Sequence, residues 1–361
     1  MNGSEVTIYG AGMSGLVAAI NLARDGYDVT VHDREDSYGG SKLYNPSTHV
    51  TPLDPIATSE YIGIDISPAF HQVLQCSSYF HELKVQLPVD EVYAVERGGR
   101  VSSLDTLLYS ECEKLSVKFE FSSALEKEDA NNFAPNTIVA CGLIPSVYTM
   151  LDIPYLKWYG WISRGEIDLS SYAWLWWDEC ITEYGYLSAV NNYYFDLLFS
   201  IREVGRDCLE KYKRFMVHNE GIEHPDDSWE YVRGAVPLAS RENPRLFHNG
   251  AIMCGTMSGA MDPFMWFGIS GALVTGKVAA IAVGDRAAAE REFARFTKRF
   301  KAMYEFKNKL WYPLVRPRVG VLEKMIRLAG VENVNKAGLM TEQGKVPVKM
   351  AVPGFSHMSC S

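Results

Sequence analysis

The pattern of apolar and polar residues predicts a β-turn-α-β unit in the first part of the chain. Residues 6–9 form a short apolar run typical of a buried strand, and residues 13–24 are rich in Ala and Leu, as a helix is. Residues 28–32 alternate apolar and polar side chains and predict a second strand. Turn-forming residues then dominate residues 36–55, so the unit is expected to end there.

Further elements follow from the same patterns. A hairpin turned at Gly98-Gly99 is predicted over residues 92–101. The remaining predicted elements are a helix at 104–114, strands at 117–121, 137–140 and 251–254, an apolar helix at 268–283 and a long charged helix at 287–310. Residues 153–245 are rich in Trp and Tyr and predict several strands, with one helix at 194–213. The first unit and the strands at 137–140 and 251–254 are expected to share one sheet.

Composition excludes several classes of protein. Of 361 residues, 47% are hydrophobic and 22% charged, which is ordinary for a globular protein. The formal net charge of −9 makes nucleic acid an unlikely partner, because phosphate binding needs a basic face. Seven scattered cysteines have neither C-x-x-C nor metal-ligand spacing, which favours a reduced, cytoplasmic location and no metal site. No secretory signal or membrane span is expected, since the run at 268–283 contains Gly276 and Lys277.

A glycine motif carries the first chemical prediction. Gly10-Ala11-Gly12-Met13-Ser14-Gly15 is G-x-G-x-x-G between a predicted strand and a predicted helix. The first glycine permits a tight turn, the second lets the backbone approach a pyrophosphate, and the third lets helix and strand pack closely. Asp33 follows the second strand, where a carboxylate accepts hydrogen bonds from an adenosine ribose. The unit predicts a bound dinucleotide, which is NAD or FAD.

Two further segments favour FAD. Residues 34–40 extend the second strand into a Gly-Gly turn, as in flavoproteins. Residues 254–272, which contain Asp262-Pro263 and Gly268-Ile269, resemble the second flavin-contacting motif of the p-hydroxybenzoate hydroxylase-like superfamily. The chain resembles the geranylgeranyl reductase-like branch of that superfamily over residues 4–45, 137–155, 172–177 and 250–285. Its motifs at 172–177 and 262–269 also resemble those of flavin-dependent halogenases. One departure is Thr256, where the family usually has Asp.

The resemblance implies an α/β fold, with a Rossmann-like FAD-binding domain (GR2-type) interleaved with an antiparallel β-sheet substrate domain and followed by a helical C-terminus. The expected boundaries are 1–90, 100–152 and 246–285 for the FAD-binding domain, 153–245 for the substrate domain, 286–333 for the helices and 334–361 for a loose tail. The residues expected at the cofactor are Gly10, Gly12, Met13, Ser14, Gly15, Asp33, Arg34, Gly40, Ser41, Cys141, Gly142, Gly255, Thr256, Pro263, Gly268 and Ile269. Because the sequence has one nucleotide fingerprint, an NAD(P)H donor is expected to bind transiently, unless a separate reductase supplies the electrons.

Aromatic residues crowd the predicted substrate domain. Strand alternation places about half of them on one face, which either lines a cavity for a hydrophobic substrate or forms ordinary core. The substrate-contacting candidates are Trp174, Trp176, Trp266 and Phe267. For proton transfer the candidates are His49, in a predicted polar loop, and Asp262, beside Pro263.

The charged helix at its C-terminal end is also amphipathic. Phe293, Phe296, Phe300 and Tyr304 recur at helical spacing among lysines and arginines. Such a face either packs on the body of the protein or contacts an anionic membrane peripherally.

The leading function hypothesis is an FAD-dependent oxidoreductase that transfers hydride to or from an isoprenoid-like or aromatic substrate. The alternative within enzymes is a flavin-dependent monooxygenase or halogenase-like enzyme. The alternative from another class is a non-catalytic prenyl- or lipid-binding protein of the escort type, which the missing carboxylate at Thr256 keeps open.

Overall fold

Strands from distant parts of the chain form the first sheet, as the sequence predicts. The computed structural model describes residues 4–339 except 88, 238–242 and 299. Its six-stranded sheet has the order β15-β16-β9-β1-β2-β8, parallel throughout except for the edge strand β15. The strands are β1 (Glu5–Tyr9), β2 (Asp28–Asp33), β8 (Lys118–Phe121), β9 (Thr137–Val139), β15 (Phe247–His248) and β16 (Ala251–Met253).

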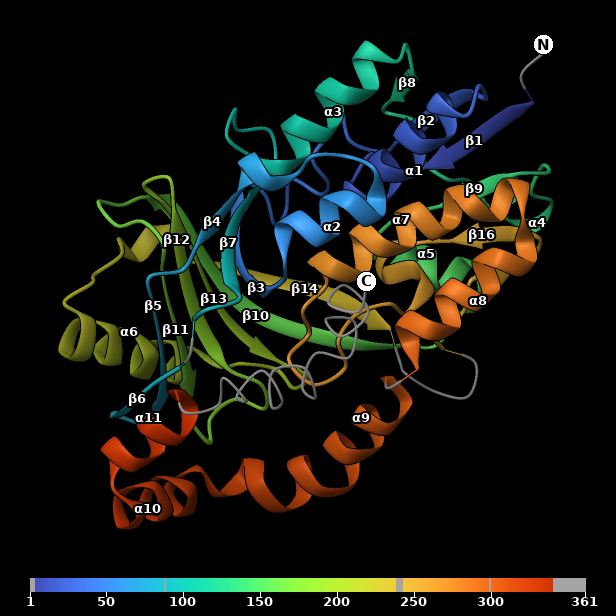
Figure 1. The fold of residues 1–361 in the computed structure, drawn as a ribbon. Helices are drawn as coiled ribbons and strands as arrows, with labels where there is room; N and C mark the ends of the chain where they lie inside the picture. The colour runs from blue at the N-terminus through green and yellow to red at the C-terminus, as the bar shows by residue number, and fades with distance from the viewer. Residues whose placement is uncertain (1–3, 88, 238–242, 299, 340–361) are drawn as a thin grey trace.

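Three helices pack around this sheet and bury its core (Figure 1). They are α1 (Met13–Arg24), α3 (Leu104–Lys114) and α7 (Ile269–Gly284). A Cβ on Gly276 of α7 would lie 2.6 Å from the Ser14 carbonyl oxygen, so only glycine allows α1 and α7 to approach this closely. Shorter helical segments complete this part: α2 (Pro55–Ile62), η1 (Ser67–Ala69), α4 (Lys127–Asn131), α5 (Pro145–Met150) and η3 (Gly255–Ser258).

A three-stranded sheet of order β3-β7-β4 replaces the predicted hairpin. Its strands are β3 (Ser47–Pro52), β4 (Phe70–Gln72) and β7 (Val92–Arg97). The hairpin prediction was wrong because the chain after Gly98 turns into α3 instead of pairing back on β7. Ser103 caps that helix, its Oγ accepting the Thr106 N–H at 3.1 Å.

The aromatic region forms a seven-stranded sheet of order β14-β10-β13-β12-β11-β5-β6. Its strands are β5 (Gln75–Phe80), β6 (Leu83–Gln86), β10 (Tyr155–Glu166), β11 (Tyr172–Trp177), β12 (Gly185–Val190), β13 (Tyr193–Ser200) and β14 (Glu230–Pro237). Strands β5 and β6 lie within residues 1–90, so that boundary does not separate the two sheets. They join the second sheet because β5 pairs in parallel with β11.

The helix predicted at 194–213 was wrong in its first half. Residues 193–200 are strand β13, which is hydrogen-bonded to β10 on one side and β12 on the other. Two ladders of backbone bonds outweigh the helical preference of an isolated segment. The helix α6 (Arg206–Glu220) begins after Gly205 and packs on the outer face of the sheet, near the short segment η2 (Asp226–Ser228) (Figure 1).

The C-terminal helices form an arm rather than one long helix. The arm consists of α8 (Arg286–Thr297), α9 (Phe300–Phe306), the π-helix η4 (Lys307–Val315), η5 (Arg316–Arg318), α10 (Val319–Ala329) and α11 (Val331–Leu339), and Figure 1 shows it passing below the second sheet. The predicted helix at 287–310 is instead divided into α8, α9 and the start of the π-helix η4, within which Pro313 cannot donate a backbone hydrogen bond. Phe293, Phe296 and Phe300 are buried, so this face packs on the body. The loose tail expected over residues 334–361 was wrong for residues 334–339, which belong to helix α11, and residues 340–361 lie outside the described part of the chain.

Cysteine pairing differs from the expectation of reduced thiols. Cys180, after β11, and Cys208, in α6, form a disulfide that joins the edge of the second sheet to the helix covering it. Spacing alone gave no sign of this pair, because 28 residues separate its members. Across the described part of the chain, no helix has the length and apolar character needed to cross a membrane.

Candidate active site

A cavity of about 560 Å³ extends from the turn after β1 to the inner face of the seven-stranded sheet. This volume is typical of small-molecule and cofactor sites. Its lining is polar at the first sheet, where the glycine turn and the end of β2 contribute, and aromatic at the second sheet.

The three glycines of the turn serve different physical purposes. Gly10 has φ +117°, and a Cβ there would lie 2.5 Å from the Ala140 carbonyl oxygen. A Cβ on Gly15 would lie 1.9 Å from the Gly10 carbonyl oxygen, so this glycine is needed for packing of helix on strand. Gly12 lines the cavity, and a Cβ there would have no atom within 4 Å. The space beside Gly12 is therefore open for a ligand.

The ends of α1 and β2 supply donors and an acceptor to this part of the cavity. No side chain caps the N-terminus of α1, so its first amide groups and its positive dipole end face the cavity. The Asp33 carboxylate accepts the N–H groups of Ala11 at 2.6 Å and Glu35 at 2.9 Å. Burial raises the pKa of Asp33, and these hydrogen bonds oppose that shift. Beside it, Arg34 donates to Ser41 Oγ at 3.0 Å.

The segment after β16 approaches the same turn from the other side. Gly255 has φ +60°, and a Cβ there would lie 2.5 Å from Ser14 Oγ. Thr256 lines the cavity, and its Oγ1 is buried without a hydrogen-bond partner among the described residues. A buried hydroxyl of this kind normally has a partner, so it is free for a ligand group. Open space at Gly12, uncapped helix amides, the Asp33 carboxylate and the Thr256 hydroxyl together fit a dinucleotide.

The second sheet provides the aromatic wall of the cavity. The side chains shared by the wall and its core cluster are Trp158, Leu175, Tyr184, Tyr186, Phe195, Leu197, Phe199, Val236, Met261, Met265 and Trp266. Neighbouring rings contact edge to face, as Trp158 and Phe199 do at a centroid distance of 5.3 Å. The wall therefore offers apolar surface and few polar groups to a bound molecule.

Comparison with known proteins gives a consistent picture of the fold. A family model described as an NAD(P)-binding Rossmann-like domain matches residues 8–49. Structural similarity covers nearly the whole chain. The p-nitrophenol 4-monooxygenase PnpA from Pseudomonas putida superposes with a TM-score of 0.61 at 14% identity, over 95% of this chain and 98% of that one. FqzB superposes with a TM-score of 0.59 at 16% identity, over 98% and 94%.

The chain shares the fold of these two solved structures. Sequence similarity to curated proteins is local. The flavin-containing monooxygenases FMO GS-OX4 and FMO GS-OX2 of Arabidopsis thaliana are 37% identical over 89 residues and 42% identical over 88 residues. In both cases the match covers 24% of this chain and 16% of the relative, so it shows likeness in one segment only.

Most residues expected at the cofactor line the cavity. Those that do are Gly10, Gly12, Met13, Ser14, Asp33, Arg34, Gly40, Ser41, Cys141, Gly142, Gly255, Thr256, Gly268 and Ile269. Gly15 and Pro263 lie behind this lining. Burial raises the pKa of Cys141 to about 12, so its side chain is a neutral thiol and not a nucleophile.

Of the two substrate candidates on β11, Trp176 does not line the cavity and Trp174 reaches only its boundary, whereas Trp266 and Phe267 line it. Trp176 packs in the core between the sheet and α6. Trp174 touches the cavity boundary, but its indole belongs to the same core and donates to Tyr212 Oη at 3.2 Å. Alternation along β11 puts both even-numbered rings on the α6 side and Leu175 on the cavity side.

Sequence reasoning did not single out the β12 and β13 side chains that form much of the wall. Tyr186, Phe195, Leu197 and Phe199 line the cavity. The odd-numbered spacing of the last three was the available signal for a strand, but this segment was predicted to be a helix.

His49 lies on strand β3 rather than in a loop, and it lines the cavity. Burial lowers its pKa to about 3, with a contribution from the charge of Arg97, so the imidazole is neutral at physiological pH. Its Nε2 lies 2.9 Å from Ser47 Oγ, whose proton is donated to Asn45 Oδ1 at 2.7 Å. Nε2 therefore carries the ring proton. Nδ1 is an acceptor that lies 3.2 Å from Tyr186 Oη, but Tyr186 donates its own proton to the Thr48 carbonyl at 2.8 Å, so Nδ1 has no donor among the described residues.

Asp262 orders the loop that precedes α7. Its Oδ2 accepts the N–H groups of Phe264 at 3.0 Å and of Met265, while Oδ1 has no hydrogen-bond partner among the described residues. Burial raises its pKa to about 7, against the hydrogen bonds and the charge of Lys307. The carboxyl group is buried behind the cavity lining, so it acts on the loop backbone.

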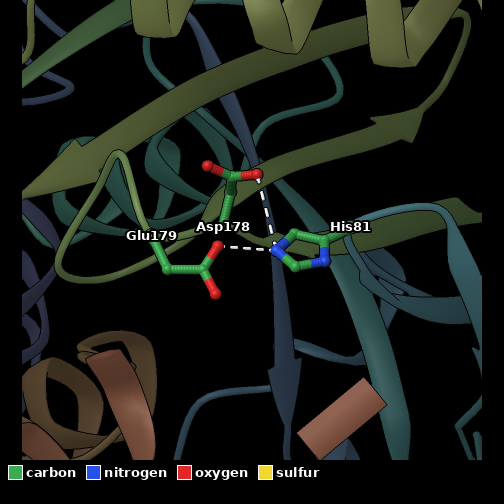
Figure 2. Close-up of side chains that lie close together, drawn as sticks. All are labelled: His81, Asp178 and Glu179. Atoms are coloured by element: carbon green, nitrogen blue, oxygen red, sulfur yellow. Dashed lines mark hydrogen bonds and ion pairs between the residues drawn. The ribbon is translucent and has the colours of Figure 1, made fainter. Parts of the chain in front are cut away.

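A separate cluster of His81, Asp178 and Glu179 lies at the edge of the second sheet (Figure 2). His81 Nε2 lies 2.6 Å from Glu179 Oε2 and 3.9 Å from Asp178 Oδ2, while Nδ1 lies 2.8 Å from Glu323 Oε2 on α10. Partial burial lowers the pKa of His81, but its hydrogen bonds to Glu179 and Glu323 outweigh this and raise it. Asp178 Oδ2 also pairs with Lys211 at 2.5 Å. These groups satisfy one another as an ion-pair network that joins the arm to the sheet.

Proposed function

We propose that this chain is an FAD-dependent oxidoreductase that acts on a hydrophobic organic substrate. The observation that carries the proposal is the continuity of the cavity, whose lining passes from the glycine turn and Asp33 to the aromatic wall. A dinucleotide bound at the polar end would bring its reactive ring system toward the apolar end, where a hydrophobic molecule fits. Bound FAD would accept or deliver a hydride and, once reduced, could react with oxygen.

The chain's own residues bind the cofactor in this proposal. The amides at the start of α1 hold the diphosphate beside Gly12, and the Asp33 carboxylate accepts hydrogen bonds from the adenosine ribose. Thr256 Oγ1 takes the hydrogen bond that a carboxylate makes in related motifs. An NAD(P)H donor binds transiently or is replaced by a separate reductase.

The aromatic wall and His49 act on the substrate. The wall excludes water and binds apolar surface, with Trp266 and Phe267 closing the end nearest α7. Neutral His49 accepts a hydrogen bond from a substrate hydroxyl at Nδ1, which is open to it because Tyr186 donates its own proton to the Thr48 carbonyl. Asp262, which lies behind the lining, keeps the loop in shape.

Monooxygenation is the reaction we favour. The printed name of one structure with this fold, PnpA, and those of the curated relatives describe monooxygenases. The second candidate is reduction of an isoprenoid-like double bond, as in the geranylgeranyl reductase-like branch, because residues 262–269 resemble the motif of that branch. Halogenation is a further alternative on the same motif.

Two measurements separate these reactions. The flavin-loaded chain is first reduced anaerobically with NADH and then with NADPH, while the flavin absorbance is followed. Oxygen uptake is then measured with panels of aromatic and prenyl compounds. Oxygen consumed in proportion to hydroxylated product supports the monooxygenase. Oxygen-independent saturation of a prenyl chain supports the reductase. A colourless protein that binds prenyl compounds supports the escort-type alternative.

We also propose a cytoplasmic location with peripheral contact to an anionic membrane. The face involved differs from the expected one. Phe306, Leu310 and Leu314 are exposed on the arm, with Lys301 and Lys309 nearby in the sequence, and Val321, Met325 and Leu328 of α10 are exposed as well. Flotation with vesicles containing phosphatidylserine tests this contact, and absence of the chain from the floated fraction at low salt would refute it.

A further inference from the structure

The loop of residues 262–267, here called the Trp266 loop, forms the part of the cavity wall next to α7. Met265, Trp266 and Phe267 all line the cavity. The loop is closed by two backbone hydrogen bonds, from the Asp262 N–H to the Phe267 carbonyl at 2.9 Å and from the Trp266 N–H to the Asp262 carbonyl at 3.0 Å. Trp266 has φ +61°, a left-handed conformation that is rare for a bulky residue and must be held by its surroundings.

Two buried charged residues from outside the loop hold Trp266. Glu183 Oε2 accepts the indole Nε1–H of Trp266 at 2.9 Å. Lys307 Nζ donates to the same oxygen at 2.8 Å and to the Phe264 carbonyl of the loop at 2.6 Å. Lys307 Nζ also lies 4.4 Å from the centre of the Trp266 ring, which is within the range of a cation–π contact. The Lys307 and Glu183 side chains are 1% and 2% exposed.

The arm fixes this pair from behind. Tyr312 donates to the other oxygen of Glu183. Arg316, which is 4% exposed, donates to the backbone carbonyls of Asp178 at 2.8 Å and Glu183 at 2.7 Å. The residues of η4 and η5 therefore bind the backbone of the loop between β11 and β12, which presents Glu183, as well as the Glu183 side chain.

A buried ion pair is weak evidence for added stability, because an apolar pair of similar volume is often as good. What an apolar pair cannot do is hydrogen-bond the Trp266 indole and the Phe264 carbonyl at the same time. We infer that Lys307 and Glu183 are positioning residues that fix Trp266 in the cavity wall, so that the C-terminal arm determines which hydrophobic molecules fit. The part of this inference that concerns ligand binding rests on the proposed function. The part that concerns the conformation of the Trp266 loop does not.

The test compares three variants of the full chain. Lys307→Met removes the charge and both loop contacts. The double variant Glu183→Leu with Lys307→Met removes both members of the ion pair, so neither is left as a buried charge without the other, and it keeps the inference testable should the single variant fail to fold. Lys309→Met is the matched control, because Lys309 lies two residues along the same helix, is exposed and pairs only with Glu305 in the described structure.

The first measurement is hydrogen–deuterium exchange of peptides spanning residues 255–272, which needs no ligand. We expect about tenfold faster exchange in the Trp266 loop of the double variant, with wild-type exchange in Lys309→Met. Wild-type protection of the loop in a folded double variant would overturn the inference.

The second measurement titrates the flavin-loaded chain with 2-naphthol as an aromatic probe and follows the flavin absorbance. We expect about tenfold weaker probe binding in the double variant and unchanged FAD affinity. Equal loss of FAD and probe affinity would mean a general structural defect and would overturn the positioning role. If the wild-type chain bound no flavin, the proposed function would fall while the exchange measurement still decided this inference.

Discussion

The substitution of alanine for Gly12 separates cofactor binding from folding. Gly12 has φ −85° and ψ 178°, an extended conformation that alanine adopts without strain. An added Cβ meets no atom within 4 Å, so the methyl group would point into the open cavity. The folded chain without ligand should therefore tolerate Gly12→Ala, while a dinucleotide that approaches this backbone should not.

The expected magnitudes follow from this geometry. In the chain without ligand, replacing the glycine N-cap lowers the unfolding free energy by a few tenths of a kcal/mol or somewhat more. Alanine also reduces the entropy of the unfolded state, which raises the unfolding free energy by about 0.4–1 kcal/mol. The net change should therefore be less than about 1 kcal/mol. With a diphosphate against the turn, the methyl group overpacks the site at a cost of about 1–3 kcal/mol. That corresponds to roughly 5- to 150-fold weaker FAD binding.

The assay is fluorescence titration of FAD into flavin-free protein, together with urea unfolding of the same samples. Gly15→Ala is the matched control, because its Cβ would lie 1.9 Å from the Gly10 carbonyl oxygen. That variant should lose stability even without FAD. The reasoning is refuted if Gly12→Ala binds FAD as tightly as wild type, or if it destabilises the flavin-free chain as much as Gly15→Ala does.

Three other perturbations give distinct outcomes. The pKa of Asp262 is about 7 in the folded chain against an ordinary 3.8, so the folded state binds this proton more tightly and the unfolding free energy falls as pH rises. Asp262→Asn should remove about 3 kcal/mol of that fall between pH 5 and pH 8, as measured by urea unfolding at each pH. An unchanged dependence of the unfolding free energy on pH would contradict the assignment. Trp174→Phe should lower the unfolding free energy by about 1–3 kcal/mol, because a buried hydrogen bond is lost. Trp158→Phe should mainly change the affinity for aromatic ligands, because Trp158 Nε1 has no partner among the described residues. The opposite pattern would mean that Trp174 faces the cavity and Trp158 faces the core. Cys208→Ser removes the Cys180–Cys208 disulfide and should lower the unfolding free energy by about 3–4 kcal/mol under oxidising conditions, given the 28-residue separation. Equal unfolding free energies of variant and wild type would show that the disulfide does not form in solution.

The elements predicted best from the sequence were those whose signals are local. The first strand, α1 and the second strand follow from an apolar run, a glycine motif and an alternating segment next to one another. Helix α3 has the predicted bounds because Ser103 caps it and Lys114 ends it. The polar end of the cavity belongs to these same segments, so its residues could be named in advance.

The aromatic end depends on pairings between distant segments. Alternation shows that β11 has two faces, but only the position of α6 decides that Trp174 and Trp176 face the core. The pair of Glu183 and Lys307 is separated by 124 residues, and no sequence pattern links a lysine in an amphipathic segment to a buried carboxylate so far away. Strand β13 was missed although its Tyr and Phe residues and the alternation of Phe195, Leu197 and Phe199 favour a strand, because the predicted helix was extended too far toward the N-terminus over this segment.

The absorption spectrum of the purified full-length chain is the most direct test that the glycine turn after β1 binds a flavin nucleotide. We predict the bands of oxidised flavin, with about one FAD per chain either retained on purification or taken up from added cofactor. A correctly folded chain that stays colourless and leaves the fluorescence of added FAD unchanged would contradict this claim.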